Sequence, residues 1–249
     1  MTIDACASLV ERGDPDRFAA VMAAPVAARA LLLPIYAFNL EIARAPWVTR
    51  EPMIAEMRLQ WWRDAVAEDR PCAHEVAGPL HALIQKAGLP VPVLDAAIAA
   101  RRWDVYGDPF ADRAEFDGYL DATGGGLMWL AAVAAGAGPA VEPAARDLGW
   151  AAGLAGFLRA VPELQTRGRV PLLDGGSEAV VGLARDGLAR LARARQGTVP
   201  RAAALAAWQT SKLLRQVVAD PRRVSAGSLG LSEFDRRRLL VWQAMTGRF

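Results

Sequence analysis

Apolar residues recur at helical spacing along the whole chain, and no run alternates convincingly between apolar and polar residues. Within residues 51–66, for example, Ile54, Met57, Trp61 and Ala65 fall on one face of a helix. Alanine dominates the composition, which favours helix over sheet. The 249 residues are 53% hydrophobic and long enough to enclose one large core. The sequence therefore predicts a single all-α domain over residues 1–249, packed as a large helical bundle.

Proline, glycine and capping residues divide the chain into about ten predicted helices. Asp14 is expected to cap the first, with Pro15 at its first position, and Pro34 should bend or divide the second. The glycine triplet at 124–126 lies inside a helical pattern, so we expect it to permit close helix packing rather than to hold a phosphate. The predicted helices are 15–22, 26–45, one opening at 52, 74–87, 92–104, 111–135, 143–166, 176–195, 199–218 and 231–246.

The charges are distributed unevenly around a small total. The formal net charge is +2, so no strong overall field attracts nucleic acid, and no nucleic-acid partner is expected. Residues 1–158 carry 13 basic and 20 acidic groups, whereas residues 159–249 carry 16 basic and 7 acidic groups. The basic C-terminal part, which includes the predicted helices of 199–249, is either a solvated face or a surface for an acidic partner or anionic lipid.

The sequence shows little sign of a secretory signal, a disulfide framework or a membrane span. The N-terminus is charged too early for a secretory signal peptide, and Cys6 and Cys72 are the only cysteines. The longest uncharged run, 124–141, is rich in alanine and glycine and contains a proline, so it suits a buried helix better than a membrane span. We therefore expect a cytoplasmic protein without a transmembrane segment, either free or peripheral to the inner membrane face.

Several common catalytic and binding motifs are absent from the sequence. It has no phosphate-binding loop of the G-x-x-x-x-G-K-[ST] type, no dinucleotide fingerprint and no G-x-S-x-G elbow. His74 and His81 are the only histidines, and their spacing suits zinc poorly. Ordinary nucleotide, serine-hydrolase and zinc chemistry are therefore not expected.

Four stretches together resemble a known family. They cover residues 17–44, 51–66 with its "RLQWWRDAV", 99–132, and 158–173 with its "LRAVPELQTRGRVPLL". In order and spacing they are similar to the squalene/phytoene synthases, the head-to-head prenyl transferases, over about residues 17–212. The resemblance implies the isoprenoid-synthase type of fold, an all-α bundle around a central cavity.

Active members of that family condense two prenyl diphosphates. The charge of the departing diphosphate must be neutralised, and Mg²⁺ does this when held by carboxylate and phosphate oxygens. Carboxylates four residues apart lie on one face of a helix, so two such helices can hold metal across a cavity. The family accordingly carries two aspartate-rich motifs.

The first family motif maps onto the stretch that begins at Tyr36. Tyr36, Ala37 and Phe38 match its start. The family's arginine falls on Leu40, and its aspartates fall on Ala43, Arg44 and Trp47. The resemblance therefore predicts that this motif has lost its metal ligands.

The second motif maps onto the stretch around Arg159, which is kept, while Gly168 and Arg169 keep its basic turn. The family's asparagine falls on Gly156, and its aspartates fall on Ala160 and Leu164. No metal site, cofactor or catalytic residue is therefore expected. The candidate substrate-binding residues that remain, as vestiges, are Tyr36, Phe38, Arg159, Glu163, Arg167 and Arg169.

The leading interpretation is a non-catalytic relative that binds or assembles something. The stretches "YAFNLEIAR" and "RLQWW" resemble a degenerate branch of the family that includes an assembly factor of mitochondrial respiratory complex I. That likeness suggests a membrane-complex protein as partner, while fold alone does not establish function.

Two alternatives stay open. An active prenyl transferase would need an unusual Mg²⁺ site with Glu163, Asp104 or Asp121 as substitute ligands, although Glu163 is also placed to pair with Arg159, and Asp104 with Arg101. In a third interpretation the cavity binds an isoprenoid or another lipid without reacting it. Candidates to line it are Tyr36, Phe38, Trp61, Trp129 and Phe157.

The basic turn at 167–169 is equally compatible with an ordinary helix C-terminus, where cations are favourable.

Overall fold

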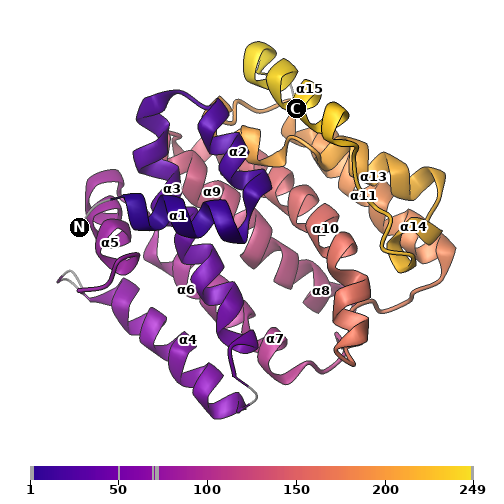
Figure 1. Ribbon diagram of the computed structural model, residues 1–249, viewed down its shortest axis with the longest axis horizontal. Helices are drawn as coiled ribbons and strands as arrows, with labels where there is room; N and C mark the ends of the chain where they lie inside the picture. The colour runs from indigo at the N-terminus through magenta and orange to yellow at the C-terminus, as the bar shows by residue number, and fades with distance from the viewer. Residues whose placement is uncertain (1–2, 50, 69, 71–72, 248–249) are drawn as a thin grey trace.

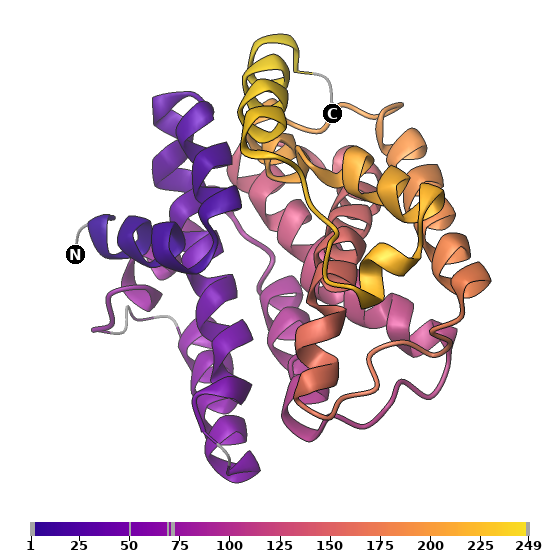
Figure 2. The same cartoon turned by 45° about the vertical axis from the view of Figure 1, so that its right-hand side comes forward.

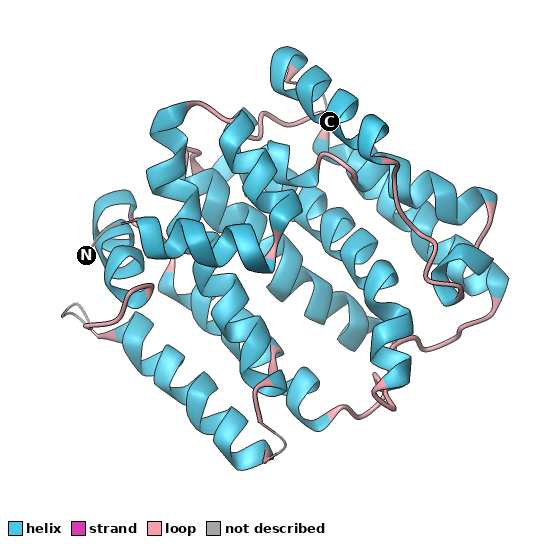
Figure 3. Ribbon diagram, in the orientation of Figure 1, coloured by secondary structure: helices cyan, strands magenta, loops and turns pink. Residues whose placement is uncertain are grey.

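The computed structural model describes residues 3–49, 51–68, 70 and 73–247, and throughout these residues the protein consists of helices and loops with no strand (Figure 3). This confirms the predicted all-α class. Cys72 lies outside the described residues. In Figure 2, helices α1 to α5 lie along one side of the molecule and helices α11 to α15 along the other.

The chain order of the elements follows the predicted pattern closely. The elements are α1 (Asp4–Gly13), α2 (Pro15–Ala23), α3 (Val26–Arg44), η1 (Ala45–Trp47), α4 (Pro52–Ala67), α5 (Ala77–Ala87), α6 (Val91–Ala100), α7 (Arg102–Tyr106), α8 (Arg113–Leu120), η2 (Asp121–Gly125), α9 (Gly126–Ala134), η3 (Pro139–Val141), α10 (Glu142–Thr166), α11 (Ser177–Ala194), α12 (Arg201–Ala204), η4 (Leu205–Ala207), α13 (Thr210–Ala219), α14 (Arg222–Ser225) and α15 (Glu233–Thr246) (Figure 1).

Local signals fix several helix boundaries. The side chain of Asp14 accepts a hydrogen bond from the backbone N–H of Arg17 at 2.9 Å, which confirms the predicted N-cap of α2. Ser232 caps α15 in the same way, because its hydroxyl accepts from the N–H of Asp235 at 3.1 Å. Gly88 ends α5 in the left-handed conformation that glycine adopts most easily.

Other boundaries differ from those expected. Helix α1 is not among the predicted helices, because no side chain caps its first turn and the sequence therefore lacks a capping signal there. Of the two outcomes expected at Pro34, division does not occur, since α3 continues through it. The helix expected over 92–104 is interrupted at Arg101, and the one expected over 199–218 is split into α12, a turn at η4 and α13.

The core lies where α3, α9 and α10 meet the surrounding helices. Gly124, in the π-helical turn η2, faces Gly149 of α10 so closely that a Cβ atom built on Gly149 would lie 2.3 Å from the carbonyl oxygen of Gly124. Only residues without a side chain allow two helix backbones to approach this closely. The prediction that the triplet at 124–126 serves close packing is therefore confirmed.

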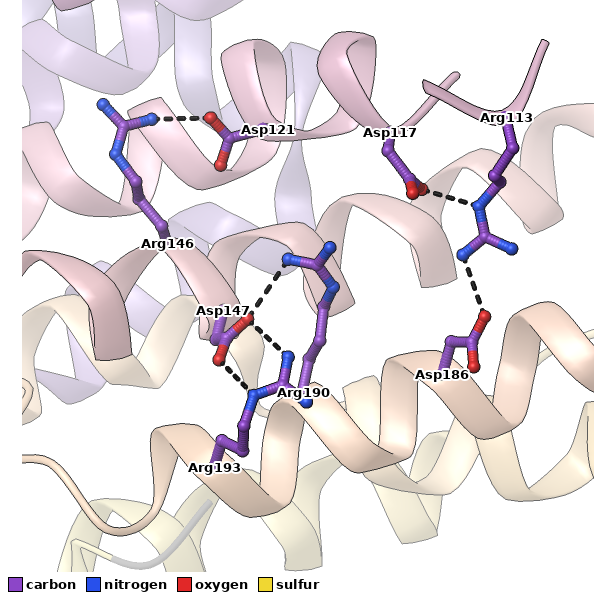
Figure 4. Close-up of polar contacts among 8 residues, drawn as sticks. All are labelled: Arg113, Asp117, Asp121, Arg146, Asp147, Asp186, Arg190 and Arg193. Carbon is purple, nitrogen blue, oxygen red and sulfur yellow. Dashed lines mark hydrogen bonds and ion pairs between the residues drawn. The ribbon is translucent and has the colours of Figure 1, made fainter. Parts of the chain in front are cut away.

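Ion pairs join η2 and α11 to α10, and join α8 to α11 (Figure 4). Asp147 of α10 accepts from Arg190 at 3.2 Å and from Arg193 at 2.9 Å, both on α11. Arg113 of α8 reaches Asp186 of α11 at 2.8 Å. These exposed or half-exposed pairs set the register of α11 more than they add stability.

One segment of the described chain, residues 26–47, is long and apolar enough to cross a membrane by length and composition alone. In the structure, 56% of its apolar window is buried against other helices. This burial is what a core helix of a bundle requires.

Candidate functional site

A cavity of about 320 Å³ lies between α3, the α7–α8 region, η2 and α10. Much of its wall is made of small or apolar residues, which leave the space open. The residues of this kind are Ala43, Trp47, Leu120, Gly124, Leu127, Met128, Gly149, Ala152, Gly153, Gly156, Phe157, Ala160, Leu164 and Ala206. The central cavity expected from the family resemblance is therefore present.

One part of the wall carries a buried polar cluster of Arg101, Asp104 and Tyr119. Arg101 Nη1 donates to Asp104 Oδ2 at 3.3 Å and to the Tyr119 hydroxyl at 3.0 Å. The Tyr119 hydroxyl in turn donates to Asp104 Oδ2 at 3.1 Å. Burial raises the pKa of Asp104, and the Arg101 guanidinium opposes that rise. The carboxylate is thus already occupied by two partners of its own chain.

A second part of the wall carries hydrogen-bonding atoms without partners. The hydroxyl of Tyr36 and Nε of Arg101 are buried and form no hydrogen bond among the described residues. Burial raises the pKa of Tyr36 to about 12, so this hydroxyl remains protonated near neutral pH. Arg17 lies beside it, with its guanidinium carbon 5.0 Å from the Tyr36 ring centroid. Buried donors without partners are costly, and a bound polar group would satisfy them.

The described residues do not fit a Mg²⁺ site of the kind the family uses. Among the described residues that line the cavity, Asp104 is the one carboxylate, and it is held by Arg101 and Tyr119. Over the described part of the chain, no three or more His, Cys, Asp or Glu side chains gather as metal ligands. Mg²⁺ bound to diphosphate normally takes one or two protein carboxylates as well.

Several of the positions that match the family's two motifs line this cavity. Ala43 and Trp47 line it from the end of α3 and from η1, and Gly156, Ala160 and Leu164 line it from α10. Gly156 and Ala160 are exposed, so the cavity opens to solvent along that side of α10. The sequence mapping thus identified both walls of the cavity.

The predicted basic residues lie mostly outside the cavity. Arg159 reaches Asp16 of α2 at 3.1 Å, and Glu163 pairs with Arg167 at 2.8 Å. The expected pairing of Glu163 with Arg159 is therefore wrong, because Arg159 pairs instead with Asp16, which is distant in sequence. Neither Arg159, Glu163 nor Arg167 lines the cavity.

Arg169 does not line the cavity itself but contacts two residues of its wall. Its Nη2 donates to the backbone carbonyl of Asp104 at 2.7 Å. Its guanidinium and that of Arg167 lie over the Trp47 ring, at 5.4 and 4.6 Å from the ring centroid. The basic turn therefore holds Trp47, which occupies one of the positions matched to a family aspartate.

The aromatic candidates divide in two. Tyr36 and Phe157 line the cavity, whereas Phe38 packs edge-on against Trp62 at 5.4 Å. Trp61 lies near the surface beside His74, and Trp129 is buried on α9 away from the cavity wall.

Of the proposed substitute ligands, Asp104 forms the expected pair with Arg101, and Asp121 pairs with Arg146 at 2.8 Å. Sequence reasoning missed Arg17, Asn39 and Tyr119 as wall residues. All three lie inside the stretches that resemble the family, which was the available signal.

Comparison with known proteins agrees with this geometry. A family model described as squalene/phytoene synthase matches residues 10–174. A crystal structure of a dehydrosqualene synthase in complex with ligand superposes with a TM-score of 0.80 at 15% identity, over 98% of this chain and 95% of that one. A squalene synthase from Alicyclobacillus acidocaldarius gives 0.73 at 14% identity, over 90% and 94%. At these identities the structural likeness shows the fold alone.

Curated relatives are assembly factors. Assembly factor 6 of NADH dehydrogenase (ubiquinone) complex I from Mus musculus is 27% identical over 169 residues, which is 66% of this chain and 51% of the relative. The homolog from Drosophila melanogaster is 28% identical over 171 residues, 63% of this chain and 50% of the relative. The chain therefore spans about half the length of the curated relatives it matches.

Proposed function

Because the chain belongs to the squalene/phytoene synthase family, we propose that it is a non-catalytic member that acts by binding, in the assembly of a respiratory membrane complex. The observation that carries the proposal is the character of the two facing cavity walls. Where the resemblance places family aspartates, the walls carry Ala43, Trp47, Ala160 and Leu164.

The chemistry supports this reading of the cavity. Ionising a prenyl diphosphate requires the leaving diphosphate to be neutralised, and alanine, tryptophan and leucine recruit no Mg²⁺. Asp104, the remaining wall carboxylate, already neutralises the buried charge of Arg101. The apolar wall, the unpartnered Tyr36 hydroxyl and the nearby Arg17 instead suit an isoprenoid or lipid that is held without being cleaved.

The assembly role rests on the curated relatives, which are named as complex I assembly factors. We infer a protein of that respiratory membrane complex as the partner. The proposal also places the protein in the cytoplasm, at or near the inner face of the membrane that holds the complex.

The first test measures pyrophosphate release. Purified protein is incubated with farnesyl or geranylgeranyl diphosphate and Mg²⁺, beside an active family enzyme as positive control, and its folding is checked by circular dichroism. We expect no release above the background without protein. Release that requires both metal and protein would overturn the non-catalytic assignment.

The alternative of an active transferase is favoured by one observation, the retention of the whole fold and its cavity. It makes a distinct prediction. Turnover would depend on Mg²⁺ and would be lost when Asp104, Asp121 and Glu163 are replaced together by Asn.

The second test addresses assembly directly. The gene for this chain is deleted, and assembled NADH dehydrogenase complex is measured by native electrophoresis and by NADH oxidation in isolated membranes. We expect both to fall, and to be restored by the wild-type chain. An unchanged amount of assembled complex would contradict the assembly role while leaving the cavity assignment intact.

A further inference from the structure

The outer face of α15 carries an apolar ridge that is left exposed by the other described elements. Phe234, Val241 and Met245 are 73%, 58% and 77% exposed. Their spacing of seven and then four residues aligns them along one side of the helix. A surface helix normally turns polar residues to solvent, so an apolar stripe there marks a contact surface.

The opposite face of α15 is held firmly against the body of the protein. Gln243 is buried, and its Nε2 donates to the backbone carbonyl of Trp208 at 2.9 Å. Arg236 forms ion pairs with Asp16 of α2 and with Glu233, the latter at 3.5 Å. The ridge is therefore presented by a docked helix at the edge of the bundle, where Figures 1 and 2 place α15.

A groove of about 610 Å³ lies beside this ridge, between α13 and α15. Its apolar residues are Ala219, Leu231, Leu239 and Trp242, and its cations are Lys212, Arg215 and Arg238. The indole of Trp242, 47% exposed, lies on α15 between the groove and solvent. The groove thus combines an apolar floor with a cationic rim.

The charge of that rim is only partly balanced. Arg238 pairs with Asp235 at 3.1 Å, the one carboxylate among the groove residues. In the portion of the chain that the structure describes, no carboxylate lies within ion-pair distance of Lys212 or Arg215, and both are exposed. Two cations therefore remain available to an anionic ligand.

From these features we propose that α15 and the neighbouring groove dock the protein on an anionic lipid surface. Phe234, Val241 and Met245 enter the boundary between headgroups and acyl chains, while Lys212 and Arg215 contact lipid phosphates. An exposed apolar stripe with a neighbouring tryptophan is a feature of interfacial helices, and here the unpaired cations are supplied by α13 in the adjoining groove. The exposed apolar ridge beside two unpaired cations matches the acyl boundary and the phosphates of an anionic bilayer. This inference does not depend on the proposed assembly role.

The test is co-sedimentation of the full chain with vesicles of phosphatidylcholine alone or mixed with phosphatidylglycerol. We expect binding only to the mixed vesicles, and weakening at high salt because headgroup attraction is screened. Lys212→Gln with Arg215→Gln should weaken binding about 30-fold, equivalent to about 1 kcal/mol per cation. Phe234→Ser with Met245→Ser should weaken it at least about tenfold through lost apolar contact.

Matched controls use the exposed apolar and basic residues of the α3–α4 region. Met53→Ser with Met57→Ser, and Arg44→Gln with Arg58→Gln, alter exposed side chains of the same types elsewhere. These variants should bind mixed vesicles like the wild type. Equal binding to both vesicle types, or loss in the controls but not in the α15 variants, would overturn the proposal. So would a dimer in solution that the ridge variants convert to monomer, because a second copy would then cover the ridge.

Discussion

Arg101 and Asp104 form an ion pair of 3.3 Å in the wall of the central cavity, with only 13% and 6% of their side chains exposed. They lie on either side of the break between α6 and α7, and Tyr119 of α8 bonds to both. The pair therefore ties three helices together. It also engages Asp104, the one carboxylate among the described wall residues, and so makes Asp104 a structural group rather than a free ligand.

Removing one partner of this pair should be costly. Asp104→Ala leaves the Arg101 guanidinium buried without a counter-charge, and we expect it to lower the free energy of unfolding by about 3–5 kcal/mol. Arg101→Met with Asp104→Leu should cost less than Asp104→Ala alone, because no buried charge remains. Urea unfolding measures both, with Glu163→Ala on the exposed face as control. A loss below about 1 kcal/mol for Asp104→Ala would contradict the structural role.

The glycines of α10 offer a second, internally controlled prediction. A Cβ atom on Gly149 would meet the backbone of Gly124, which cannot move aside, whereas one on Gly156 meets nothing within 4 Å. We expect Gly149→Ala to lower the midpoint of thermal unfolding and to cost about 1–3 kcal/mol from overpacking. Gly156→Ala should be neutral or should stabilise by about 0.4–1 kcal/mol, because alanine suits a helix interior. The reverse order would show that the two backbones are not in contact.

The sequence predicts which segments are helical, but it does not predict where a helix is interrupted. Asp14 and Pro15 predict the start of α2, because capping depends on neighbouring residues only. The break at Arg101 has no local marker, because it is stabilised by Tyr119 and Asn39 from other helices. Tertiary contacts of this kind outweigh the helix propensity of the residues, and they produce no signal in the spacing of apolar residues along the sequence.

For the candidate site, the sequence predicts the position of the cavity walls but not the ion pairs around them. The family resemblance located both cavity walls, because Ala43 and Ala160 occupy motif positions whose spacing the helix preserves. It failed for Arg159, whose partner Asp16 lies 143 residues earlier in the chain. Ion pairs between distant segments depend on how helices pack, and a single sequence does not specify that.

The buried thiol of Cys6 predicts how stability changes at alkaline pH. Burial raises the pKa of Cys6 to about 11 from the ordinary thiol value of 9.0, with a further rise caused by Glu75. Because the folded state holds this proton more tightly than the unfolded state, its contribution is complete below about pH 9 and is lost as pH rises towards 11. We expect a fall of about 2–3 kcal/mol in unfolding free energy over that window. In Cys6→Ala the fall should be shallower, and an identical slope would exclude Cys6 as its source.

The facing positions of the two cavity walls allow a test by restoration. Ala43→Asp with Ala160→Asp places carboxylates on opposite walls, and the exposure of Ala160 keeps the cost of desolvating its new charge low. Mg²⁺ prefers carboxylate and phosphate oxygens together, so this variant should bind inorganic pyrophosphate in a Mg²⁺-dependent manner by calorimetry. Ala43→Asn with Ala160→Asn matches the size without the charge and should bind no more than the wild type. If the wild-type chain itself showed equal Mg²⁺-dependent binding, its own residues would already hold the metal, and the non-catalytic proposal would lose its basis.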